Sequence, residues 1–204
     1  MRLFAVLPIF VAAFGLLLLI AFRSGTTKFT HFHSFPMSPF TAVALVLQGF
    51  AQFLIGRMTY QARLIACVLA VSIIGTMHGL LIIQAVIAFS SAESQARMLT
   101  QNMPVLPSLG TMLSFMLLSS VVLLYQFRAP MLTLVGLHLF VVVLGALALL
   151  GHVIGDSRLY WYSERMSVAM APHTAFLLIL LGAWGVWRIR ALDAEDKKRT
   201  PTVP

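Results

Sequence analysis

Six long apolar runs, separated by shorter polar segments, dominate the pattern of this chain. They cover about residues 3–22, 40–55, 64–89, 111–125, 131–154 and 174–187. The hydrocarbon core of a bilayer is about 30 Å thick, and a helix that crosses it needs about 20 apolar residues. The runs lack the alternation of polar and apolar residues that barrel strands require. The pattern therefore predicts an all-α polytopic membrane protein with six transmembrane helices.

The connections between the runs alternate in length. Two are tight turns and three are long loops, at residues 57–61, 126–130, 23–39, 90–110 and 155–172. The two kinds of connection must lie on opposite sides of a membrane, and the short-turn side is richer in Lys and Arg. Because basic residues concentrate in cytoplasmic segments, we expect both termini in the cytoplasm. The domain prediction is a membrane domain over residues 1–190 and a cytoplasmic tail over 191–204.

Composition agrees with a membrane location. Hydrophobic residues make up 60% of the 204 residues and charged residues 10%, whereas a soluble domain carries about 25% charged residues. The net charge of +8 resides in loops and tails, so the orientation rule explains it better than nucleic-acid binding does. The single cysteine, Cys67, lies in an apolar run and cannot form an internal disulfide. We expect the chain to have the lipid bilayer as its partner and not to bind nucleic acid.

A short pattern recurs where three of the runs begin. The second run opens with Met-Ser-Pro-Phe-Thr-Ala and the sixth with Met-Ala-Pro-His-Thr-Ala, each with a glycine eight residues after the threonine. The fourth opens with Leu-Gly-Thr-Met, and a serine replaces the later glycine. Proline suits the first turn of a helix, and threonine can bond free backbone groups there. The residues concerned are the helix starts Pro39, Thr41, Thr111, Pro172 and Thr174, and the packing glycines Gly49 and Gly182.

The recurrence predicts three units, each made of a helix, a long loop and a helix that begins with this pattern. Paired glycines in the odd runs extend the hypothesis: Gly75 and Gly79 in the third run, and Gly151 and Gly155 in the fifth, are four residues apart. This spacing puts both glycines of a pair on one helix face, where a neighbouring helix can approach closely. We expect the two pairs to hold equivalent packing positions.

The segment 151–155, the pair Leu159-Tyr160 and the start of the sixth run carry a resemblance to a known family. Together they resemble the N-terminal multi-pass membrane sensor regions of bacterial histidine kinases and diguanylate cyclases, closely over residues 145–185 and loosely over 37–125. The resemblance implies a signal-input module of the bacterial inner membrane that senses a small or lipophilic ligand or the membrane state. Kinase, cyclase and PAS segments follow such regions but are not found here, which leaves a truncated module or a stand-alone subunit.

Candidate chemistry is confined to histidines. His78, His138 and His152 lie within apolar runs, and His173 lies at the start of the sixth. Ionisable groups inside a membrane span indicate function, and imidazoles are common haem ligands. His78, His152 and His173 are therefore candidate cofactor ligands. The alternative for each histidine is hydrogen bonding between helices or helix capping, and the cofactor stays unknown.

Motifs of catalysis are missing. The sequence has no phosphate-binding loop, nucleophile elbow or paired-cysteine motif, and no carboxylate lies within an apolar run. We therefore expect no enzyme, no catalytic residue and no metal site. Two functions remain beside signal input. One is a structural accessory subunit of a larger respiratory or photosynthetic membrane complex, with a protein partner in the membrane. The other is a haem-binding electron-transfer protein.

Overall fold

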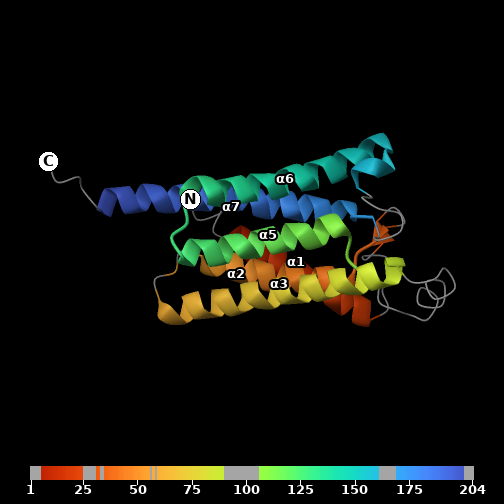
Figure 1. Cartoon of the computed structure of the whole chain (residues 1–204), viewed down its shortest axis with the longest axis horizontal. Coiled ribbons are helices and arrows are strands. Elements are labelled where there is room, and N and C mark those ends of the chain that lie inside the picture. The colour runs from red at the N-terminus through yellow and green to blue at the C-terminus, as the bar shows by residue number, and fades with distance from the viewer. Residues whose placement is uncertain are drawn as a thin grey trace.

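The computed structural model describes residues 6–24, 31–32, 35–55, 57, 59–89, 106–160 and 169–199. These residues form six α-helices: α1 (Leu7–Arg23), α2 (Pro39–Leu54), α3 (Tyr60–Phe89), α5 (Leu109–Gln126), α6 (Met131–Ile154) and α7 (Pro172–Arg199). A short antiparallel pair, β1 (His31–Phe32) and β2 (Phe35–Pro36), and a 3₁₀ helix, η3 (Ser157–Leu159), complete the described elements. The helices lie lengthwise beside one another as a bundle (Figure 1), and the predicted helical fold is confirmed.

Within the described part of the chain, four helical segments are long and apolar enough to cross a membrane: Tyr60–Phe89, Leu109–Gln126, Met131–Ile154 and Pro172–Glu195. The apolar helices α1 and α2 are shorter, with 17 and 16 residues. At a rise of 1.5 Å per residue, 16 residues extend about 24 Å, somewhat less than the thickness of the hydrocarbon core. Several long apolar helices thus support the expected membrane location.

The helix boundaries follow from local sequence. Ser38 caps α2 by accepting a hydrogen bond from the backbone N–H of Phe40 at 3.2 Å, and Pro39 occupies the first helical position. Ser108 caps α5 by accepting from the N–H of Thr111 at 3.1 Å. Such caps satisfy backbone donors that the first turn of a helix leaves free. Gly155 ends α6 with φ of 75°, in the left-handed region that favours glycine.

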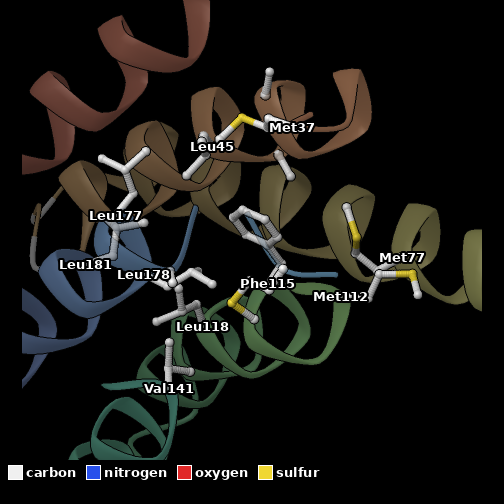
Figure 2. Close-up of a cluster of buried hydrophobic side chains, with 14 of the residues drawn as sticks. Met37, Leu45, Met77, Met112, Phe115, Leu118, Val141, Leu177, Leu178 and Leu181 are labelled. Atoms are coloured by element: carbon white, nitrogen blue, oxygen red, sulfur yellow. The ribbon is translucent and has the colours of Figure 1, made fainter. Parts of the chain in front are cut away.

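The helices pack as three pairs that follow the order of the chain: α1 with α2, α3 with α5, and α6 with α7. The second helices of the pairs, α2, α5 and α7, also contact one another and surround the core. Leu45, Phe115 and Leu178, one from each of these helices, are fully buried there (Figure 2). Each first helix also touches the second helix of another pair: α3 contacts α2, α6 contacts α5, and α1 contacts α7.

Glycines bring the first and third pairs into backbone contact. A Cβ added at Gly49 would lie 2.5 Å from the carbonyl oxygen of Pro8, and one added at Gly182 would lie 2.9 Å from that of His138. Real Cβ atoms do not approach so closely, so only glycine fits these two positions. The first and third pairs therefore depend on these residues for their helix separation.

Candidate functional site

The starts of α2, α5 and α7 meet at one end of the bundle around a small polar cavity. Its volume is about 10 Å³, which is room for about one water molecule. Its polar side chains, all of them buried, are Ser38, Thr41, Ser108, Thr111 and Thr174. The first N–H groups of a helix are unpaired and carry partial positive charge. Three helix starts therefore give this cavity a positive electrostatic potential.

The three starts contribute the same positions to the cavity. Ser38, Ser108 and Ala171 each lie three residues before the buried threonine and line the cavity. The carbonyl oxygen of each accepts a hydrogen bond from the N–H four residues on, at 3.1, 2.9 and 3.0 Å in chain order. Alanine at position 171 lacks the hydroxyl that caps α2 and α5. The predicted helix starts at Pro39, Thr41, Thr111, Pro172 and Thr174 thus gather at one place.

Two side chains from first helices bind the backbone just ahead of these starts. Gln84 of α3 donates from Nε2 to the carbonyl oxygen of Pro107 at 2.6 Å. His152 of α6 bonds through Nε2 to the carbonyl oxygen of Met170 at 2.7 Å. Because a carbonyl oxygen only accepts, Nε2 of His152 must carry the proton. The His152 ring also stacks on Tyr160, with centroids 4.0 Å apart.

Gln84 and His152 thus bond the backbone at similar places ahead of the two helix starts, whereas the two glycine pairs, expected to be equivalent, differ in their surroundings. No described residue comes within 4 Å of a Cβ built at Gly75 or Gly79. By contrast, a Cβ at Gly151 would lie 2.7 Å from the Cβ of Leu159. Gly155 serves as a helix cap rather than a contact. The spacing was the same, but glycine spacing does not fix which face of a helix meets a neighbour.

The structure does not bring all three candidate cofactor ligands together. His78 is exposed on α3, and its Nδ1 bonds the carbonyl oxygen of Ile74 within the same helix at 3.0 Å. His152 and His173 belong to α6 and α7, neither of which is a main neighbour of α3. Among the described residues, no group of three or more His, Cys, Asp or Glu side chains is placed to hold a metal ion. His152 and His173 lie on the neighbouring helices α6 and α7, and their imidazoles are close enough to interact electrostatically. Of the three expected ligands, the structure therefore separates His78 from the other two.

Sequence reasoning missed a polar layer in the centre of the bundle. Ser119 of α5 donates to Oε1 of Gln48 at 2.8 Å, and Gln52 lies with Nε2 3.5 Å from Nε2 of His138. Nδ1 of His138 is 2.9 Å from the carbonyl oxygen of Leu134, so it donates there and leaves Nε2 to accept from Gln52. All four side chains are 0% exposed. They join α2, α5 and α6 by polar contacts within the apolar core.

Two atoms of the polar layer, Nε2 of Gln48 and Oε1 of Gln52, have no hydrogen-bond partner among the residues that the structure describes. An unpaired polar atom in an apolar interior is costly, so this layer is held together by the surrounding packing. Gly185 of α7 makes room for it, because a Cβ there would overlap the His138 ring. The available signal was the four-residue spacing of Gln48 and Gln52 in an apolar run, which places both on one helix face.

Comparison with known proteins gave no match. No protein-family model, no curated protein and no solved structure matches this chain.

Proposed function

We propose that this protein is a non-enzymatic signal-input module of a bacterial inner membrane, with six spans, three related helix pairs and both termini in the cytoplasm. The observation that carries the proposal is the convergence of three corresponding helix starts on one buried polar cavity. A change at such a cavity acts on three helices at once. The site would lie at the outer face, where the long loops meet the bundle.

Corresponding contacts support the three related units. A Cβ at Gly15 would lie 2.8 Å from the carbonyl oxygen of Ala42, and one at Gly145 would lie 2.8 Å from that of Ala175. Ala42 and Ala175 each follow the threonine of a helix start. The middle unit has Thr111 at the corresponding place. Over the nine residues that begin with each threonine, at 41–49, 111–119 and 174–182, buried, half-buried and exposed positions follow one another in the same order. This agreement in burial supports the three units predicted from the sequence.

The same correspondence supports six spans. The short helices α1 and α2 pack against each other through the same kinds of glycine contact as α6 and α7. Since α6 and α7 both meet the length and composition of a span, a pair built in the same way is suited to the same bilayer. A small thinning of the bilayer or a polar extension at each end accommodates the difference in length.

Helix α7 offers a route from the cavity to the opposite end of the bundle. It starts next to Ala171, which lines the cavity, and continues without interruption to Arg199. Its 28 residues extend about 42 Å, and its C-terminal end projects beyond the other helices (Figure 1). A rigid helix transmits a displacement at one end to the other, and helix shifts of about 1–2 Å are typical of switching proteins.

A distance measurement tests the proposal. In a Cys67→Ser background, spin labels at Phe127→Cys and Ala194→Cys report the position of the end of α7 against the turn between α5 and α6. Thr174→Leu enlarges a buried cavity residue, and we expect the distance distribution to shift by about 1–2 Å or more. Phe176→Leu, on the exposed face of the same helix, is the control. An unchanged distribution in Thr174→Leu would contradict transmission through α7.

A second function, an accessory subunit with a protein partner in the membrane, is favoured by the outer face of α3. This helix is the least buried of the four long apolar segments, with 28% of its apolar window inside the structure. Gly75 and Gly79 lie open there, and His78 is exposed beside them. Glycine pairs and polar side chains facing lipid are typical of helix–helix interfaces in membranes. Purification in mild detergent followed by native mass spectrometry separates the two functions, because a stoichiometric partner lost in Gly79→Leu would support the subunit.

A further inference from the structure

A second, larger cavity lies on the outward side of α5, between α3 and α6. We call it the lateral cavity. Its volume is about 310 Å³, within the range of about 300–1,000 Å³ that small-molecule sites occupy. Its walls are formed by Leu81 of α3, by Met112, Leu113 and Met116 of α5, and by Leu144 of α6. It is therefore separate from the polar cavity, although both border the first turns of α5.

The lateral cavity lies beside the helix pair that departs from the other two. Met112 follows Thr111 where Ala42 and Ala175 follow the other two threonines. Met77 lies seven residues before Gln84, as Gly145 lies seven before His152. The two methionine side chains thus stand where the third pair has a glycine and an alanine, and they lie next to each other (Figure 2). They hold α3 and α5 apart by side chains rather than by backbone contact.

The chemistry of the walls selects a hydrocarbon. Apart from the thioether sulfurs of Met112 and Met116, the side chains that line the cavity are aliphatic. The backbone of Gly110 also borders it, but that carbonyl oxygen already accepts from Oγ of Ser114 at 2.7 Å. A quinone or sterol head would lose its hydrogen bonds to water here without gaining new ones. A chain of methylene groups makes no hydrogen bonds to water, so it loses none when it enters the cavity.

The position of the cavity along α5 indicates which lipid supplies the hydrocarbon chain. The cavity borders Leu109 through Met116, and seven residues of helix rise about 10 Å. One leaflet of the hydrocarbon core is about 15 Å thick, half of the total. The cavity therefore lies within the leaflet on the side of the helix starts. A phospholipid of that leaflet has its headgroup beside the start of α5 and its chains at the depth of the cavity.

We propose that the lateral cavity binds one acyl chain of a phospholipid from that leaflet. A chain in this position contacts the first turns of α5, whose other side carries Ser108 and Thr111 of the polar cavity. The inference needs only a membrane location. Where the proposed signal-input function holds, it names the acyl chain as the class of ligand that the module reads.

Photocrosslinking tests occupancy directly. Purified full-length protein is placed in bilayer discs that contain phosphatidylcholine with a diazirine at mid-chain, irradiated, digested and mapped by mass spectrometry. We expect labels concentrated on the segment 109–116. In Leu144→Trp the yield there should fall about tenfold, because excluding about two methylenes costs about that much in affinity. Leu147→Trp, on the exposed side of the same helix, is the matched control and should keep the label.

Other outcomes would overturn the proposal. Labels spread evenly over the exposed faces of α3 and α6, or a yield that Leu144→Trp leaves unchanged, mean that the cavity holds no particular chain. Displacement of the label by a short-chain quinone means that the occupant is a quinone. Leu113→Trp, at a partly exposed wall residue, repeats the test if Leu144→Trp does not fold. The photocrosslinking experiment does not depend on the position of α7. An empty cavity would therefore contradict the acyl-chain proposal alone, and the signal-input proposal would still be tested by the spin-label distance.

Discussion

The first and third helix pairs differ from the middle pair in how their helices meet. In α1/α2 and α6/α7, glycines such as Gly49 and Gly182 let one helix lie against the backbone of the other. In α3/α5, Met77 and Met112 occupy the contact instead. Backbone contact fixes the separation of two helices closely, whereas methionine is flexible and fills irregular space. The comparison indicates two rigid pairs and one adjustable pair, and the larger cavity lies beside the adjustable one.

The polar residues divide between the pairs in a complementary way. The polar layer takes its two glutamines from the first pair, Ser119 from the middle pair and His138 from the third. Ser119 stands eight residues after Thr111, where the other pairs have Gly49 and Gly182. Ser119, which stands in place of the glycine in the middle pair, thus binds Gln48 of the first pair. The difference between the pairs therefore serves contacts across the bundle.

The largest expected effect comes from a substitution that disrupts the backbone contact between α1 and α2. Gly49→Leu places a side chain where the backbone of α1 lies, so we expect destabilisation of about 3 kcal/mol or more from overpacking. Thermal unfolding in detergent, followed by circular dichroism, measures it. The comparison fails if Gly49→Leu unfolds at the same temperature as the parent protein.

The second-largest expected effect tests whether methionine side chains separate the helices of the middle pair. Met112→Ala removes a buried side chain from the α3/α5 contact, and we expect a loss of about 2–4 kcal/mol from lost burial and an unfilled space. Met112→Leu keeps the volume and should cost less than about 1.5 kcal/mol. The same unfolding assay applies. Equal stability of the alanine variant and the parent would show that the methionine does not set the helix separation.

A smaller effect concerns the polar layer. Gln52→Leu removes the donor to Nε2 of His138 and leaves that nitrogen without its partner, so we expect a cost of about 1–2 kcal/mol. In the double variant Gln52→Leu/His138→Leu the nitrogen left without its partner is itself removed, and part of the loss should be recovered. A double-mutant cycle measures the coupling. Additive losses would mean that the two side chains do not interact.

The smallest effect concerns the outer face of α3. Gly75→Ala and Gly79→Ala meet open space and sit at helix positions that accept alanine, so stability should change by no more than about 1 kcal/mol, in the stabilising direction. Comparing the stability of these variants with that of Gly49→Leu and Gly49→Ala separates the effect of helix packing within the chain from the effect of replacing a glycine. A large loss in Gly75→Ala would show that a partner covers this face in the purified protein, and cross-linking would then detect that partner.

Local features of the structure were predictable from the sequence. The apolar runs predicted the helices, and the recurring proline and threonine predicted where α2 and α7 begin. These features depend on neighbouring residues alone. That the three starts surround one cavity depends on the packing of helices far apart in the chain, which the pattern does not contain.

A short motif admits two environments, and the sequence does not choose between them. Gly75 and Gly79 have the spacing of packing glycines but point away from the described chain. His152 was a candidate haem ligand, yet its ring is used for a bond to Met170 and a stack on Tyr160. Gln48 and Gln52 carry no charge, so a search for ionisable groups within the apolar runs does not find them. Which face of a helix is buried is decided by tertiary contacts, which single-residue patterns do not contain.

The central claim is that three corresponding helix pairs cross the membrane six times and gather their second-helix starts at one outer face. Cysteine labelling in intact cells tests it most directly, with single cysteines introduced into Cys67→Ser protein at the exposed positions Ser24, Ser157, Phe127 and Ala194. The account predicts that a membrane-impermeant maleimide labels Ser24→Cys and Ser157→Cys in intact cells, and labels Phe127→Cys and Ala194→Cys only after lysis. Labelling of Ser24→Cys and Ser157→Cys from opposite sides of the membrane would contradict it.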